Sequence, residues 1–132
     1  MKIHSREAPT VENAKDAVRA TSYSGLLGLA SRVPVYSSSL PGALGRYSFK
    51  VIKDRNGKVV SVEDRKIELD TGKHSNAAEL GATLAHELKH TDDEISGVSG
   101  FFEESETPRM EERANSVDRQ VIRELLDQGR VA

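Results

Sequence analysis

The strongest constraint on the fold is a change of periodicity between residues 47 and 94. Apolar and polar residues alternate in the segments Tyr47–Ile52 and Val59–Val62, which are joined by the turn sequence Asp54–Gly57. This pattern predicts a β-hairpin, because an Asn-Gly pair readily takes the positive φ angles of a tight turn. Ile67–Leu69 either extends the second strand or forms a third one. From Asn76 onward the period becomes helical, so the strand pair leads directly into a long helix.

The remaining segments predict helices on both sides of this unit. The expected elements are a helix Val11–Thr21 capped by Thr10, a short helix or turn over residues 22–32, a short strand Val33–Tyr36, the long helix from Ser75 or Asn76 to Asp93 or Glu94, and a last helix from Thr107 to near Gly129. The predicted class is α+β, with a small antiparallel sheet packed against helices.

Composition limits the possible functions. At 132 residues the chain is expected to form one domain, residues 1–132. It is 36% hydrophobic and 30% charged with a net charge of −2, so nothing indicates nucleic acid or a membrane as a partner. Without cysteine, any metal must be held by histidine and carboxylate. No signal segment is apparent, so a cytoplasmic protein is expected, with secretion by a signal-independent route left open. The oligomeric state is not predicted.

The long helix contains the motif His-Glu-x-x-His at residues 86–90. On a helix, His86 and His90 lie one turn apart, about 40° around the axis and roughly 6 Å along it. Two imidazoles at this spacing can bind one zinc ion from the same side. Glu87 lies about 100° from His86, so it cannot easily join them as a ligand but can act as a general base on a zinc-activated water. The motif therefore predicts hydrolytic zinc chemistry.

A surface helix that carries two histidines by chance is the alternative. Leu80, Leu84 and Leu88 form the apolar face, and both histidines point nearly opposite to it, as ordinary surface residues would. Small or apolar residues such as Gly81 and Ala85 nevertheless precede the motif, as expected for a helix packed on more than one side. These neighbours favour the zinc interpretation.

The segments "ATLAHELKH" and "EERAN" together resemble the gluzincin metallopeptidases, including the ImmA/IrrE-like and HtpX-like peptidases. The resemblance implies a zincin-like domain with one zinc ion per chain, held by His86, His90 and Glu111, with Glu87 as general base. It also implies that Asn115 supports a ligand by an outer hydrogen bond. A protein or peptide would be the substrate, and a regulatory protease or a secreted bacterial effector would be the biological setting.

Helical geometry bears independently on the third ligand. The last helix is predicted to carry an apolar stripe at helical spacing, made of Met110, Ala114, Val117, Val121 and Leu125. Glu111 borders this stripe, whereas Glu112 points to solvent. Glu111 is therefore preferred to Glu112. The other acidic candidates after the motif are Glu103, Glu104, Glu106 and Asp118.

Three further assignments are open at this stage. Tyr36, Tyr47, His74 or an arginine could stabilise the oxyanion. Strand Val59–Val62 or the segment Ile67–Leu69 could pair with a substrate main chain or simply form interior sheet. Phe101 and Phe102 could line a side-chain pocket or simply fill helix packing.

Two functions other than proteolysis fit the same residues. One is a binding module that zinc stabilises without turnover, and the other is a metal-free helical interaction domain. Substitution of Glu87 separates the first from an enzyme, and the absence of stoichiometric zinc would identify the second.

Overall fold

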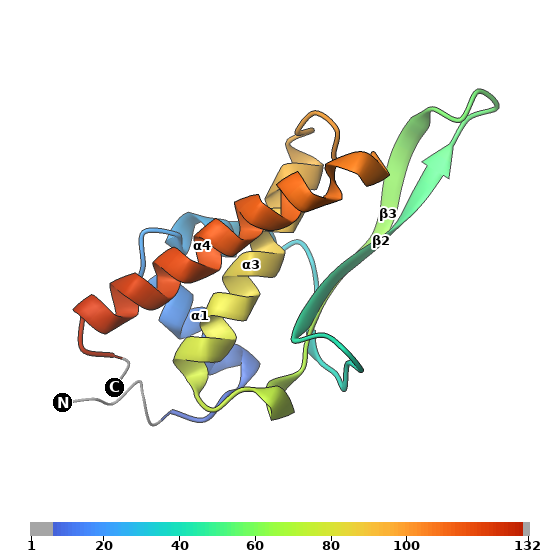
Figure 1. The fold of residues 1–132 in the computed structure, drawn as a ribbon. Coiled ribbons are helices and arrows are strands. Elements are labelled where there is room, and N and C mark those ends of the chain that lie inside the picture. Colours follow the sequence, from blue (N-terminus) through green and yellow to red (C-terminus); the bar gives the residue numbers. More distant parts are fainter. Residues whose placement is uncertain (1–6, 131–132) are drawn as a thin grey trace.

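The computed structural model describes residues 7–130 and has an α+β architecture (Figure 1). Within that range, no helix is both long and apolar enough to cross a membrane. The elements are α1 (Val11–Arg19), α2 (Leu27–Ala30), β1 (Val35–Ser37), β2 (Gly45–Lys53), β3 (Val59–Leu69), α3 (Ala77–Ile95) and α4 (Thr107–Asp127), with single 3-10 turns at Ser24–Leu26, Thr71–Lys73 and Glu104–Glu106.

Helix α3 occupies the centre of the molecule and packs against α1, α4 and strand β2 (Figure 1). Its start is fixed by Asn76, whose side chain accepts a hydrogen bond from the backbone N–H of Glu79 at 3.0 Å. The Glu79 carboxylate in turn accepts from the N–H of Ser75 at 3.0 Å, one residue before the cap. Leu80, Leu84 and Leu88 are fully buried. The predicted apolar face of α3 is therefore its core face.

Helices α1 and α4 cover two other sides of α3. A Cβ built on Gly81 would lie 2.9 Å from the Cβ of Ala17, so α1 approaches α3 as closely as glycine allows. Helix α1 ends at Arg19, two residues before the predicted end at Thr21. The stripe predicted on the last helix is confirmed, because all five of its members are buried: Met110, Ala114, Val117, Val121 and Leu125.

The sheet has the order β1-β3-β2 and is mixed, so the predicted small antiparallel sheet is right for the hairpin and wrong for β1. Strand β2 runs antiparallel to β3, but β1 pairs in parallel with the last residues of β3, from Val35 opposite Ile67 to Ser37 opposite Leu69. The segment Ile67–Leu69 extends the second hairpin strand, which is one of the two alternatives predicted for it. Strand β3 is therefore the central strand of the sheet.

The hairpin turn differs from the predicted geometry. Gly57 has a positive φ of 79°, whereas Asn56 does not. The carboxylate of Asp54 accepts hydrogen bonds from the backbone N–H groups of Asn56 and Lys58, at 2.8 and 2.9 Å. A side-chain acceptor thus organises the turn, and only the glycine takes the left-handed conformation.

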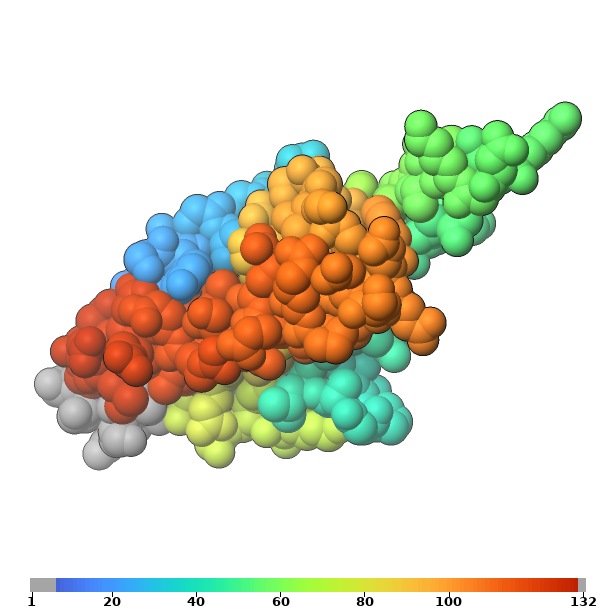
Figure 2. Space-filling view, turned by 45° about the horizontal axis from the view of Figure 1, so that its top comes forward, coloured from blue at the N-terminus to red at the C-terminus, as the bar shows by residue number. Residues whose placement is uncertain are grey.

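The outer part of the hairpin, residues 50–64, projects beyond the body as an arm (Figures 1 and 2). No side chain of this segment is buried. The inner part of the same hairpin lies against α3, with Ile67 and Leu69 fully buried. One pair of strands therefore belongs to the core at one end and to the solvent at the other.

Candidate metal centre

Two histidines of α3 and one glutamate of α4 converge beside strand β2. Potential ligand atoms of His86, His90 and Glu111 all lie within 4.8 Å of one another. The Glu111 carboxylate is 2.8 Å from Nε2 of His90 and 3.3 Å from Nε2 of His86. The histidine side chains are 14% and 12% exposed, and that of Glu111 is 50% exposed. The cluster is therefore walled by protein on the histidine side and open to solvent on the glutamate side.

The other acidic candidates take different places. Glu112 turns away and accepts a hydrogen bond from Arg119 at 2.7 Å. Glu106 accepts one from Arg109 at 2.8 Å. Glu103 and Glu104 are exposed and are not part of the cluster. Of the two glutamates compared by helical geometry, Glu111 is the one whose carboxylate lies next to the histidines.

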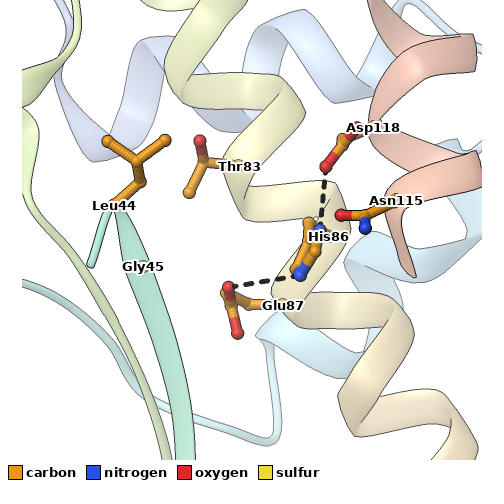
Figure 3. Close-up of a pocket in the computed structure, with 7 residues that line it drawn as sticks. All are labelled: Leu44, Gly45, Thr83, His86, Glu87, Asn115 and Asp118. Carbon is orange, nitrogen blue, oxygen red and sulfur yellow. Dashed lines mark hydrogen bonds and ion pairs between the residues drawn. The ribbon is translucent and has the colours of Figure 1, made fainter. Parts of the chain in front are cut away.

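Asp118 supports His86 from α4. One of its carboxylate oxygens is 2.8 Å from Nδ1 of His86 (Figure 3). A carboxylate can only accept, so Nδ1 carries the proton and the lone pair of His86 is on Nε2, the atom that faces Glu111. Asn115, expected in this outer role, lies in the same pocket but makes no hydrogen bond to either histidine within the described part of the chain.

A signal for Asp118 was present in the sequence. Residues 111, 115 and 118 follow one face of α4 at helical spacing, so an acidic residue one turn after Asn115 must point toward the same partner helix. The sequence spacing predicts Asp118 only as a candidate third ligand. Its role as a hydrogen-bond partner of His86 depends on how α4 crosses α3, which the sequence alone does not specify.

The side chain of Glu87 projects from α3 and is buried against the first residue of β2. Burial raises the pKa of Glu87 to about 7, and the nearby charges of Glu111 and Asp118 act in the same direction. The electrostatic influence of the His86 ring and a hydrogen bond from the backbone N–H of Tyr47 oppose this rise. One oxygen of Glu87 is 4.0 Å from Nε2 of His86. The carboxylate is therefore adjacent to the cluster and disposed to hold a proton near neutral pH.

The pKa of His90 is shifted in the opposite direction. Burial lowers its pKa below the ordinary value of 6.5, although the charge of Glu111 opposes the change. A neutral imidazole is the form that binds a metal ion, so this environment favours the ligand state of His90.

Glycine is required where β2 meets α3. A Cβ on Gly45 would lie 2.8 Å from Cγ2 of Thr83 and 3.2 Å from both Cγ and Oε2 of Glu87. No other residue lets the strand approach the helix this closely without displacement. The contact places the backbone of β2 directly beside the Glu87 carboxylate.

The free edge of the sheet beside the cluster is β2 and not either of the two candidate segments, which form interior sheet, the second of their two alternatives. Val59–Val62 and Ile67–Leu69 belong to the central strand β3. Ile67 donates its N–H to Pro34 on the side of β1, so its antiparallel partner Tyr47 directs its own N–H away from β3. That orientation agrees with the hydrogen bond from Tyr47 to Glu87.

Most of the candidates for oxyanion stabilisation are occupied elsewhere. The Tyr47 hydroxyl donates to Glu94 at 2.7 Å, and Arg65 binds the same carboxylate. The His74 ring bonds to the carbonyl of Asp70 and the hydroxyl of Thr83. Tyr36 is 51% exposed on β1, the strand farthest from the free edge of β2.

Two pockets flank the cluster along β2. The polar pocket, of about 230 Å³, is shown in Figure 3 and is lined by Leu44, Gly45, Thr83, His86, Glu87, Asn115 and Asp118. The aromatic pocket, of about 240 Å³, is lined by Tyr47, Phe49, His90, Phe101, Thr107, Met110 and Glu111. Because β2 contributes to both, an extended chain lying along its free edge would pass from one pocket across the cluster to the other.

The donor set fits zinc. Two imidazole nitrogens and one carboxylate oxygen are three ligands that zinc commonly binds in catalytic sites, where a fourth position stays open. Nε2 of His86 is left with its lone pair by Asp118, and the exposed side of Glu111 leaves the cluster accessible. No protein-family model matches the chain, and no curated protein or solved structure shows significant similarity to it.

Proposed function

We propose that this protein is a zinc-dependent endopeptidase in which His86, His90 and Glu111 hold one zinc ion and Glu87 is the general base. The proposal rests above all on one observation, the meeting of these three side chains beside a buried Glu87. A chance pair of surface histidines would have no reason to meet a glutamate from another helix and a carboxylate at Nδ1.

Each protein group has a separate task. When bound, zinc supplies a Lewis acid that polarises a peptide carbonyl and lowers the pKa of a water molecule toward neutrality. Glu87 takes the proton of that water on its carboxylate and delivers it to the leaving amine. The backbone N–H of Tyr47 and the close approach of Gly45 orient the Glu87 carboxylate. Asp118 holds His86 in the tautomer that offers Nε2.

A protein or peptide substrate is favoured by the free edge of β2. An extended peptide can add to an exposed sheet edge through main-chain hydrogen bonds, which require no particular side chains. Pockets lie on both sides of the cluster, so residues before and after the cleaved bond have room, as an endopeptidase requires. In this proposal the fold is a minimal zincin-like domain of gluzincin type. A cytoplasmic regulatory protease and a secreted bacterial effector are both compatible with it.

The decisive experiment compares Glu87→Gln with a matched Glu112→Gln control. Gln is nearly isosteric with Glu but cannot accept the proton, so Glu87→Gln should bind zinc as native protein does and lose cleavage. Glu112→Gln should keep both. New N-termini generated in a denatured proteome would be mapped for all three proteins, and the zinc content measured by elemental analysis.

The outcomes separate the competing functions. Cleavage at the native rate by Glu87→Gln would exclude Glu87 as the base. Stoichiometric zinc without cleavage by native protein would indicate a zinc-stabilised binding module. Absence of zinc from all three proteins would favour a metal-free interaction domain.

A further inference from the structure

The aromatic pocket begins where the metal cluster ends. His90 and Glu111 form one wall of it, and β2 supplies another wall through Phe49. Since a cavity of about 150 Å³ lined by apolar side chains is enough to hold benzene, a pocket of about 240 Å³ has room for a phenyl or indole ring. A side chain in this pocket would belong to a residue next to the atoms that react at the cluster.

The rings around the pocket form a cluster outside the core of the protein. The centroids of Phe49 and Phe101 are 5.9 Å apart, and those of Phe101 and Phe102 are 5.2 Å apart with the planes nearly perpendicular. Phe49 and Phe101 are only partly buried, and Phe102 is 46% exposed. None of the three belongs to the main hydrophobic core. Apolar rings are thus held together in contact with water, where a further ring could pack edge to face.

Apart from the hydroxyl of Thr107, which is exposed, the polar groups at the pocket have partners already. The Tyr47 hydroxyl is bonded to Glu94, and Glu111 is committed to the histidines. Met110 is 4% exposed and contributes an apolar wall. A lysine or aspartate of a substrate would therefore lose water and find no charged partner other than the metal ligands, with the single hydroxyl of Thr107 as the other polar group. The polar pocket on the other side of the cluster, with Asp118 and Asn115, is chemically different.

We propose that the aromatic pocket selects substrates with a large apolar side chain, preferably aromatic, directly beside the cleaved bond. This selection rests on the proposed peptidase function. The ring of the substrate residue packs against Phe49 and Phe101, which already contact each other, while its main chain lies along β2. Phe101, from the loop between α3 and α4, is then a specificity-determining residue, and Phe49 joins the substrate-binding edge to the pocket.

The absence of tryptophan from the chain allows a direct test of binding. Zinc-loaded Glu87→Gln would be titrated against a blocked hexa-alanine peptide with one central Trp, and peptide emission recorded. Burial of the indole should shift the emission to shorter wavelength in a saturable way. For comparison, the same peptide is made with Lys or Ala in place of Trp and followed through a remote dye label. These peptides should bind at least about 10-fold more weakly than the Trp peptide.

Two variants alter the pocket in opposite directions. Phe101→Ala removes a ring that packs on the ligand, and Thr107→Phe adds a ring at the exposed rim and fills the space. Each should weaken binding of the Trp peptide by about 10-fold or more. Val60→Phe, which adds an equal ring on the distant exposed arm, should leave binding unchanged.

The last measurement of the experiment is cleavage by native protein. Its cleavage sites in a denatured proteome should be enriched in Phe, Tyr, Trp, Leu or Met at one position adjacent to the cleaved bond. No blue shift, equal affinity for the Trp and Lys peptides, or cleavage without enrichment would each overturn the proposed selectivity. Trp binding that depends on Phe101 without cleavage by native protein would retain the pocket and reject the peptidase.

Discussion

The body around α3 and the arm at residues 50–64 are held in contrasting ways. Helix α3 is enclosed by α1, α4 and the sheet, and its leucines are fully buried. The arm consists of two paired strands that project beyond the body (Figure 1). None of its side chains is buried. The candidate metal site belongs wholly to the body, on two long helices whose side chains are fixed by packing. Strand β2 joins the two regions, since it begins against Glu87 at Gly45 and ends on the arm at Lys53.

The contrast predicts very unequal costs for removing apolar groups. Leu84→Ala in α3 should destabilise the protein by about 2–5 kcal/mol, because it leaves a cavity in a closed core. Val60→Ala on the arm should cost less than about 1 kcal/mol, because Val60 is 59% exposed. Urea unfolding followed by far-UV circular dichroism measures both. Similar costs for the two variants would mean that the arm is covered by another chain in solution.

The second prediction concerns metal affinity within the body. Glu111→Ala should weaken zinc binding by more than about 100-fold, since the loss of an outer hydrogen-bond partner alone commonly costs 10- to 100-fold. Asp118→Ala should fall within that smaller range, because it releases Nδ1 of His86. Asn115→Ala should cost less than Asp118→Ala, and Glu112→Ala should be neutral.

Competition with a chromogenic chelator places the four variants on one scale. If Asn115→Ala bound zinc more weakly than Asp118→Ala, then Asn115 and not Asp118 would be the outer hydrogen-bond partner of the ligands. An affinity of Glu112→Ala below that of Glu111→Ala would require α4 to be rotated by about 100° about its axis.

The third prediction uses the buried carboxyl of Glu87 in metal-free protein. Its folded pKa of about 7 lies above the value of 4.5 for an unperturbed glutamate, so the protonated form stabilises the fold. This stability is fully present below pH 4.5 and is lost as the pH rises through 7. Glu87→Gln cannot ionise, so its advantage over native protein should grow with pH, by up to roughly 3 kcal/mol.

Urea unfolding at pH 5 and pH 8 with excess chelator measures this difference. Glu112→Gln serves as the control, because its position is exposed and it should follow native protein at both pH values. Parallel behaviour of Glu87→Gln and native protein would show that Glu87 is hydrated in solution.

The sequence predicted what local chemistry controls and missed what depends on distant contacts. Caps at Thr10 and Asn76 and the five-residue stripe of α4 follow from neighbouring residues, and the structure contains them. Parallel pairing of β1 with β3 involves three residues of each strand, 32 positions apart, and no local pattern encodes it. The same limit applies to Asp118, whose role is set by the crossing of two helices. It also applies to β2, which became the free edge only once β1 had paired with β3.

The smallest effect is expected at the junction between the two regions. Gly45→Ala would place a Cβ 2.8 Å from Cγ2 of Thr83, so strand or helix must shift. We expect a loss of about 1–3 kcal/mol, as for other overpacked positions. Gly28→Ala is the matched control, because nothing lies within 4 Å of its Cβ position. It should be neutral or stabilising by up to about 1 kcal/mol, since alanine favours helix and restricts the unfolded chain.

A double-mutant cycle identifies the origin of the loss at Gly45. Thr83→Ser removes the methyl group that the new Cβ would meet and keeps the hydroxyl that contacts His74 at 2.8 Å. Gly45→Ala combined with Thr83→Ser should therefore be more stable than the sum of the two single effects, by about 0.5–3 kcal/mol. Recovery will be incomplete because the Cβ would still lie 3.2 Å from Cγ and Oε2 of Glu87. Strict additivity would mean that β2 already moves freely on α3, and the junction would then belong with the arm and not with the body.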